Sequence, residues 1–312
     1  MSGAGSSQQP SQAASMVTAP MVDRAAAPFR AMARLIARIL AGPLGFGLTV
    51  VFVIAGIALF LASASGAFEL GVWGHDVRHY LLATQRWIDT GSPYVPAEVA
   101  APFQYQPMTF LHPPSALLLF APFLVLPLPL WWVPLPIVAW SIAAWRPARW
   151  TWPIIALVLA YPRVHVAIIL GNSDIWVWAA IALGIRYGWP AALIVIKPSV
   201  FPLLLVGARH RSFYVGLAVA ALLCLPFGSL WIDWLHVAAN SPAGLLYSIL
   251  SLPWLLLPVL AYAARTTRSG DVPAREHQGA DDEQERGRGN RPADATQPRA
   301  AAREDPVVGE RG

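Results

Sequence analysis

The chain has 312 residues, of which 56% are hydrophobic and only 12% charged, about half the charged share of an ordinary soluble domain. The charged side chains are unevenly spread, because residues 41–264 carry nine Lys or Arg and six Asp or Glu, whereas residues 265–312 carry nine and ten. This composition excludes an ordinary soluble protein and predicts an all-α, polytopic membrane protein.

Neither the net charge nor the cysteine count indicates a soluble binding function. The formal charge of +5 comes mainly from arginines near the ends of the apolar stretches, as the positive-inside rule expects. No basic patch with interleaved aromatic residues is present, so we expect no nucleic-acid partner. The single cysteine, Cys224, lies in an apolar run. It excludes a disulfide framework or a cysteine-based metal site within one chain.

The N-terminal part divides into a leader, a surface helix and a first span. Residues 1–28 are rich in Ser, Ala and Gln and are predicted to be a disordered leader. Residues 29–40 have an apolar face and a basic face, which predicts an amphipathic helix on the membrane surface. The apolar face holds Phe29, Met32, Leu35, Ile36 and Ile39, and the basic face holds Arg30, Arg34 and Arg38. Gly42-Pro43 ends this helix, and 44–65 is the clearest span.

Further apolar stretches predict about eight transmembrane helices in a membrane domain of residues 29–264. Beyond the first span they lie near 111–126, 130–146, 151–169, 174–187, 190–207, 213–231 and 244–264. The arginines before the first span place the N-terminus inside and the polar loop 69–110 outside. Eight spans return the chain to the inside, where 265–312 would form a disordered cytoplasmic tail. The same count leaves three arginines outside, against the rule: Arg146, Arg149 and Arg186.

The loop 69–110 interrupts the apolar pattern with a segment of helical periodicity. Its apolar positions are Val77, Tyr80, Leu81, Trp87 and Ile88. This spacing predicts an extracytoplasmic interfacial helix that begins near Asp76 and ends at Gly91. The carboxylate of Asp76 at the helix start could cap free amide groups there. A proline-rich extended passage then leads into the second predicted span.

These residues resemble the GT-C class of membrane glycosyltransferases, and within it the actinobacterial α-mannosyltransferases that use polyprenyl-phosphate mannose. The resemblance covers about 44–264. It rests on Asp76, Tyr80, Gly91, Pro93, Tyr94, Phe103, Tyr105, Pro107, Pro113 and Pro114, with "LGNSD" at 170–174 and "IKPSVFP" at 196–202. It implies a cell-membrane enzyme that transfers mannose, or a related sugar, to a glycolipid or polysaccharide acceptor at the outer face, with inversion.

The resemblance assigns Asp76 the role of the base that accepts the proton of the acceptor hydroxyl. A cation should meet the charge of the departing lipid phosphate, and Arg163, Lys197 and Arg78 are the candidates. Lys197 could instead pair with a buried acid such as Asp174. Arg78 could instead contact lipid headgroups. The candidates for binding the acceptor or the sugar are His75, His79, Tyr105, His165 and Asn172.

No resident metal or other cofactor is expected, although His75, Asp76 and His79 leave a divalent cation possible. The expected partners are therefore the polyprenyl-phosphate donor, the acceptor and the bilayer. Three other acids, Glu69, Asp89 and Glu98, are expected to face water. A cluster of tryptophans at predicted span ends is expected to form interfacial belts: Trp131, Trp132, Trp145, Trp150 and Trp152.

Two alternatives remain open at this point. A transporter or flippase for lipid-linked sugars would also contain intramembrane charges and proline-broken spans, although no second copy of the 69–110 loop is found. A shortened, inactive paralogue is the other alternative. The chain lacks the further spans usual in the family, and it reads Gly171-Asn172 where relatives often have Gly-Gln before the asparagine.

Overall fold

The computed structural model describes residues 19–100, 102, 109–242 and 249–266, with side chains from Pro28 onward except that of Ile249. All of them belong to one compact unit, Met1–Thr266. The unit is built from helices, and within the described residues the β-structure is confined to an isolated bridge between Pro147 and Arg265. The all-helical prediction is confirmed. The predicted tail beyond Thr266 lies outside the described residues.

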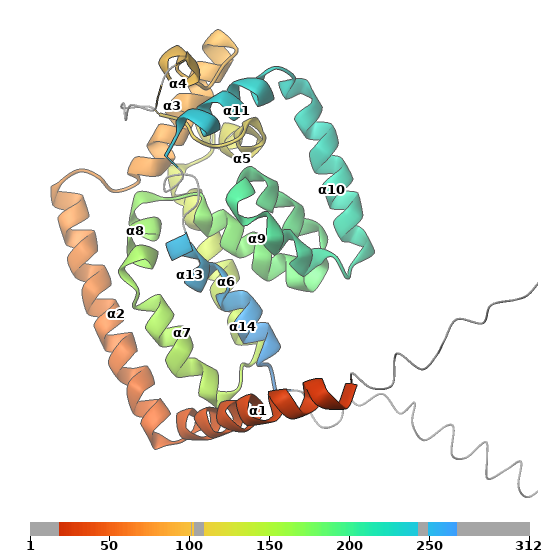
Figure 1. Cartoon of the computed structure of the whole chain (residues 1–312). Coiled ribbons are helices and arrows are strands. Elements are labelled where there is room, and N and C mark those ends of the chain that lie inside the picture. The colour runs from red at the N-terminus through yellow and green to blue at the C-terminus, as the bar shows by residue number, and fades with distance from the viewer. Residues whose placement is uncertain (1–18, 101, 103–108, 243–248, 267–312) are drawn as a thin grey trace, which may run out of the picture. The chain divides into compact units, whose positions relative to one another are not determined.

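The first two helices form an L (Figure 1). Helix α1 (Ala19–Ala41) begins ahead of the predicted surface helix and includes part of the predicted leader. Gly42 takes an extended conformation and Pro43 sits in the first turn of α2 (Pro43–Glu69), so the chain cannot continue as one helix. With 27 residues, α2 is about 40 Å long, which exceeds the hydrocarbon thickness of a bilayer, about 30 Å.

At the end of α2 opposite to α1 lie α3 (His75–Thr90) and α4 (Pro96–Ala100) (Figure 1). The predicted interfacial helix is thus a helix, and it ends at Gly91, whose φ of 81° is in the left-handed region that glycine adopts without strain. Val77 and Tyr80 face the core as the periodicity predicts, whereas Ile88 is exposed.

The remaining elements are short because prolines start or interrupt most of them. In chain order they are η2 (Pro114–Ala116), α5 (Leu117–Phe120), η3 (Ala121–Leu124), η4 (Leu128–Trp132), α6 (Pro134–Trp145), η5 (Arg149–Thr151), α7 (Trp152–Leu159), α8 (Pro162–Leu170), α9 (Asp174–Tyr187), η6 (Trp189–Ile196), η7 (Pro198–Gly207), α10 (Arg211–Cys224), η8 (Leu225–Phe227), α11 (Leu230–Asn240), η9 (Ile249–Ser251), α13 (Leu252–Leu255) and α14 (Leu257–Ala263).

In the described part of the chain, two helices are long and apolar enough to cross a membrane, α2 and the continuous stretch Leu128–Trp145. Two bent pairs raise the number to four if each counts as one span. Arg149–Leu159 with Pro162–Leu170 bends by 61°, and Arg211–Phe227 with Leu230–Asn240 bends by 92°. The structure therefore has candidate membrane spans, and the number of eight stays a prediction.

The stretch Pro114–Leu124 packs against α3 and does not form a helix of spanning length. From Leu128 the chain runs toward α1, so that η5 lies beside α1. The carbonyl of Arg146 accepts a hydrogen bond from Thr266 Oγ1 at 3.2 Å. Arg146 and Arg149 thus lie at the same end of the structure as α1, whereas the count of eight spans puts them on the opposite side.

The buried core lies around α9, whose residues from Ile175 to Ile185 are almost all inaccessible to solvent. Trp131 is fully buried there, against Phe123 and Trp176. Its predicted place in an interfacial belt is wrong, since its indole ring packs inside the protein. Trp152, by contrast, is 41% exposed.

Candidate functional site

The first turn of α3 is attached to the end of α8. The amide of Gly74 donates to the carbonyl of Ile169 at 2.8 Å. Gly171 follows α8 with a φ of 71°, and its carbonyl accepts a hydrogen bond from Trp131 Nε1 at 2.8 Å. A Cβ at this position would lie 3.0 Å from Val77 Cγ1. Glycine is therefore required by both conformation and space, and it lets the turn after α8 approach α3 closely.

This approach brings Asp76 and Asn172 together although they are 96 residues apart. Asn172 Nδ2 donates to Asp76 Oδ2 at 2.8 Å, and Asn172 Oδ1 accepts from the amide of Asp174 at 3.0 Å. The cap of α3 is Gly74, with no side-chain capping bond. The interpretation of Asp76 as an N-cap is therefore wrong, because its carboxylate faces Asn172 and not the helix amides.

Burial raises the pKa of Asp76 above its usual range. The hydrogen bond from Asn172 and the nearby His75 and His79 lower it, and Asp174 raises it further. The two imidazole rings contact each other edge to face, with centroids 4.1 Å apart. Burial and His75 lower the pKa of His79, while Asp76 opposes them. The structure thus combines a half-buried carboxyl group of raised pKa with two adjacent imidazoles.

Lys197 forms an ion pair with Asp174 Oδ1. It lies at the break between η6 and η7, where its backbone is not helical (φ −137°, ψ 85°) and Pro198 begins the next element. The side chains are 16% and 4% exposed, respectively. The predicted alternative that Lys197 pairs with a buried Asp174 is confirmed. Asn172 joins this ion pair to Asp76 through the amide of Asp174.

His112 lies close to Asp174 and Lys197, and we call these three residues together with Asp76 and Asn172 the polar cluster. His112 was not predicted from the sequence. It lies between α4 and η2, outside the candidate spans, with its Nε2 3.5 Å from Ser173 Oγ. Its ring stands edge-on to Tyr80 at a centroid distance of 5.0 Å. Burial and the charge of Lys197 lower the pKa of His112 to about 4, so it is neutral at pH 7. Its one sequence signal is its position directly before Pro113-Pro114.

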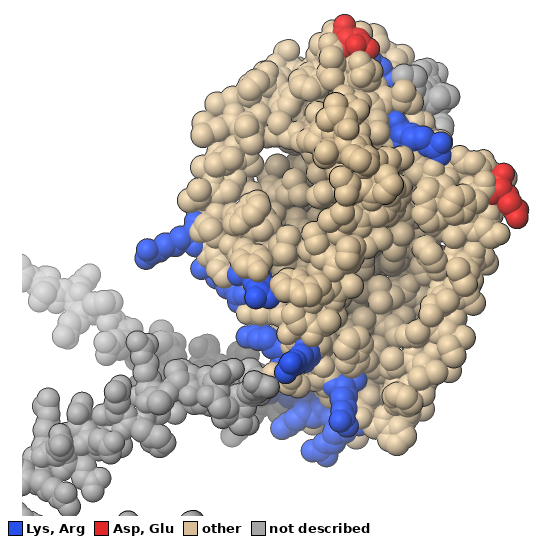
Figure 2. All heavy atoms as spheres, turned by 180° about the vertical axis from the view of Figure 1, so that it is seen from behind, with Lys and Arg blue, Asp and Glu red and all other residues tan. Residues whose placement is uncertain are grey.

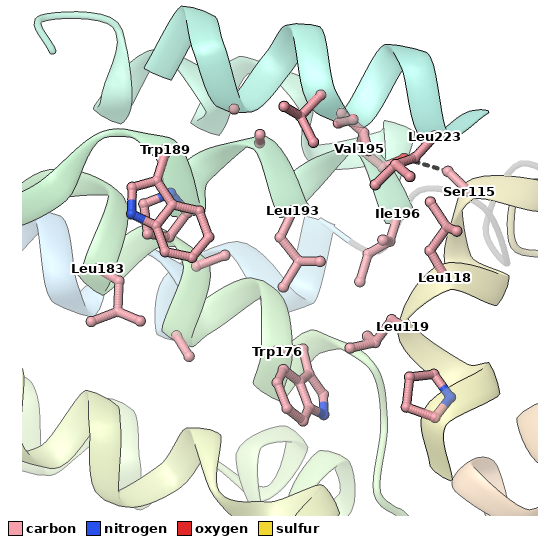
Figure 3. A pocket seen from close by; sticks show the side chains of 18 of the residues that line it. Ser115, Leu118, Leu119, Trp176, Leu183, Trp189, Leu193, Val195, Ile196 and Leu223 are labelled. Carbon is pink, nitrogen blue, oxygen red and sulfur yellow. Dashed lines mark hydrogen bonds between the residues drawn. The ribbon is translucent and has the colours of Figure 1, made fainter. Parts of the chain in front are cut away.

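An apolar cavity of about 750 Å³ lies between the Pro114–Leu124 stretch, α9, η6 and α10. Figure 3 shows Trp189 and Leu183 toward one end and Ser115, Leu118 and Ile196 toward the other. Ser115 Oγ donates to the carbonyl of Val195 at 3.1 Å. Ile196, at this second end of the cavity, is followed in the chain by Lys197.

Three further predicted site residues lie outside the polar cluster. Two of them bond to backbone carbonyls, and the third is exposed. Arg78 donates to the carbonyls of Gly71 at 3.0 Å and Trp73, so it supports the turn before α3. His165 is buried in α8 and its Nε2 lies 2.9 Å from the carbonyl of Leu159, on the other side of the α7–α8 bend. Arg163 is exposed in the first turn of α8, about 12 Å along the helix from Gly171.

Two further predictions have different outcomes. Tyr105 lies outside the described residues. Glu98 was expected to face water and is only 4% exposed. This expectation is wrong because α11 packs on α4, where Asn240 Nδ2 donates to the carbonyls of Glu98 and Val99 at 3.1 and 3.0 Å. Burial raises the pKa of Glu98.

Within the part of the chain that the structure describes, no group of three or more His, Cys, Asp or Glu side chains is placed to hold a metal ion. The sequence matches no protein-family model, and it has no match among curated proteins or solved structures.

Proposed function

We propose that this protein is a membrane glycosyltransferase that transfers mannose, or a related sugar, from a polyprenyl phosphate to a glycolipid or polysaccharide acceptor. The observation that carries the proposal is the half-buried carboxyl group of Asp76, which is oriented by Asn172 and has a raised pKa. A general base works best when its pKa lies near the operating pH and its lone pair is held in a fixed direction.

The reaction needs one proton acceptor and one leaving group. In the proposed step, Asp76 accepts the proton of the acceptor hydroxyl as that oxygen attacks the anomeric carbon of the donor. The new carbon–oxygen bond forms on one face of the sugar, and the bond to the phosphate oxygen breaks on the other. The products are the glycosylated acceptor, with inverted configuration, and the free polyprenyl phosphate. No resident metal or cofactor is part of this step.

Lys197 is the cation best placed to meet the charge of the departing phosphate. An ammonium group carries three donors, of which one is directed to Asp174. Its side chain is only 16% exposed, which supports this role, because a preorganised charge in a poorly solvated place stabilises developing negative charge most. Arg78 and Arg163 remain candidates for the phosphate, and His75, His79, Tyr105, His165 and Asn172 for the sugar or the acceptor.

The cavity supports a lipid-linked donor. Its lining is almost entirely apolar, with Ser115 and Ile196 at one end. A chain of isoprene units would fit among these apolar side chains, whereas a strongly hydrated group would lose its water there without polar partners. A water-soluble nucleotide-linked sugar has no comparable use for such a cavity.

The test is sugar transfer by the purified full chain in nanodiscs, with a lipid extract as the source of acceptor. We expect label from polyprenyl-phosphate mannose to appear in a glycolipid or polysaccharide product, and label from a nucleotide-linked mannose to remain unreacted. Failure to transfer from a panel of polyprenyl-phosphate sugars would contradict the proposal. In sealed proteoliposomes, movement of intact donor between leaflets without a new glycosidic bond would instead support a flippase.

A further inference from the structure

The end of the molecule at α1 gathers arginines from three separate parts of the chain. We call this surface the arginine end and define it by Arg30, Arg34 and Arg38 of α1 together with Arg146, Arg149 and Arg265. All six side chains are exposed. In Figure 2 most of the blue side chains lie toward this end, and the red side chains stand toward the other.

Backbone contacts fix the separate segments at this end. The amide of Ala148 donates to the carbonyl of Ala264 at 2.8 Å, and Pro147 pairs with Arg265 in an isolated bridge. Arg265 also lies over the ring of Tyr262, with its guanidinium carbon 3.9 Å from the ring centroid. The arginines that follow α6 and α14 are therefore held close together by the fold, and η5 with Arg149 packs beside α1.

The six acidic side chains between Pro28 and Thr266 are carried by the last turn of α2 and by α3, α4, α9 and α11, and none of them belongs to α1 or to the segments with Arg146, Arg149 and Arg265. Helix α2 begins beside α1 and carries Glu69 in its last turn. Helix α9 begins at Asp174 in the polar cluster and carries Arg186 in its last turn. Helix α10 begins at Arg211 and leads to α11 with Asp233 in its first turn. This separation gives the molecule one strongly basic end, which is the feature that the positive-inside rule associates with one membrane face.

Helix α1 presents a second feature at the same end. Its apolar residues are uncovered, with Phe29 75%, Met32 60% and Leu35 56% exposed. They lie on a different face of the helix from its arginines, and α1 joins the spanning helix α2 at a sharp turn. A helix with this pattern lies in the plane of the interface, its apolar face among the acyl chains and its cations at headgroup level.

Arg146 has a left-handed backbone conformation, which residues other than glycine rarely adopt. It ends α6 with a φ of 50°, and among the described residues it is the one non-glycine residue with positive φ. Glycine is the usual residue at this position after a helix, because it adopts the left-handed region without steric cost. An exposed cation kept at such a position is consistent with a use for its charge.

We propose that the arginine end binds the phosphate headgroups of anionic phospholipids in the leaflet that α1 faces, with α1 lying in the plane of that leaflet. The occupant is a lipid headgroup because the same surface offers cations and uncovered apolar side chains together, and a phospholipid supplies the complement of both. This binding site is separate from the polar cluster around Asp76 and does not depend on the proposed transfer reaction.

The test is native mass spectrometry of the purified full chain in a neutral detergent with equal amounts of phosphatidylglycerol and phosphatidylcholine. The wild type should retain phosphatidylglycerol in preference. The triple variant Arg30→Gln/Arg34→Gln/Arg38→Gln should lose that preference by about fivefold for each charge removed. The matched triple variant with Lys at these three positions retains the charge and should keep the preference.

A second variant covers the case in which the triple glutamine variant fails to fold. Arg146→Gly removes one cation from the arginine end while giving the backbone the residue that its conformation favours. It should fold and bind phosphatidylglycerol about fivefold more weakly. Equal retention of both lipids by the wild type, or an unchanged preference in both charge-removing variants, would overturn the proposal.

Discussion

Replacing Gly171 with alanine tests the close approach on which the candidate site depends. The added methyl group would meet Val77 Cγ1 at 3.0 Å and Trp131 Nε1 at 3.2 Å, at a residue whose φ is 71°. Both neighbours are fully buried, so neither can move aside freely. The turn after α8 must therefore shift away from α3, and Asn172 moves away from Asp76.

The magnitude follows from two contributions. A side chain in the left-handed conformation costs about 1–2 kcal/mol. Overpacking a tight buried contact adds about 1–3 kcal/mol. Gly91→Ala is the matched control, because Gly91 has a φ of 81° and open space at the Cβ position, so it carries only the first cost. We therefore expect Gly171→Ala to lower the free energy of unfolding by about 1–3 kcal/mol more than Gly91→Ala does.

The assay is thermal unfolding of both variants in the same detergent, where a difference of this size corresponds to about 2–4 °C for each kcal/mol. Sugar transfer should also fall in Gly171→Ala and stay near the wild-type rate in Gly91→Ala. Equal loss of stability in the two variants would refute the reasoning, since it would mean that the contact between the turn and α3 carries no energy.

Four further outcomes are expected. Lys197→Met should lower the free energy of unfolding by about 3–5 kcal/mol, because it leaves a buried carboxylate unpaired. The double variant Lys197→Met/Asp174→Asn should recover most of this loss in thermal unfolding. A double variant as unstable as the single one would contradict the buried ion pair. The transfer rate should decline as the pH falls through the raised pKa of Asp76, because only the deprotonated carboxylate accepts a proton. Asn172→Ser should move this decline in rate to higher pH, since it removes the amide donor that favours the charged carboxylate. A decline at an unchanged pH would show that Asn172 does not tune the pKa of Asp76. Ala220→Phe, which narrows the apolar cavity, should raise the KM for a long-chain lipid donor with little change in kcat, and an unchanged KM would separate the cavity from donor binding.

The features that the sequence predicted well are local ones. The helix at 75–90 follows from apolar spacing and from the stop at Gly91, both of which lie within a few turns of chain. The surface helix before Pro43 was predicted for the same reason. Its apolar positions carry large side chains that the structure leaves exposed, such as Phe29 and Met32.

The features that were missed depend on contacts between distant parts of the chain. Asp76 looked like a helix cap because its actual partner is far away in the sequence. Asn172, 96 residues later, donates a hydrogen bond to the Asp76 carboxylate. Glu98 looked water-exposed because Asn240, whose amide reaches the α4 backbone, comes far later in the chain. The span count treated every proline-broken apolar stretch as a crossing. The stretch Pro114–Leu124 instead packs beside α3.

The most direct test of the proposed role of Asp76 is sugar transfer from polyprenyl-phosphate mannose by membranes that hold equal amounts of wild type, Asp76→Asn or Asp89→Asn. Asp89 is the matched control, because it is an exposed carboxylate on the same helix. We expect Asp76→Asn to lose about 10²–10⁴-fold in rate, as removal of a general base does, and Asp89→Asn to stay near the wild type. Transfer by Asp76→Asn at the wild-type rate would contradict the assignment of Asp76 as the base.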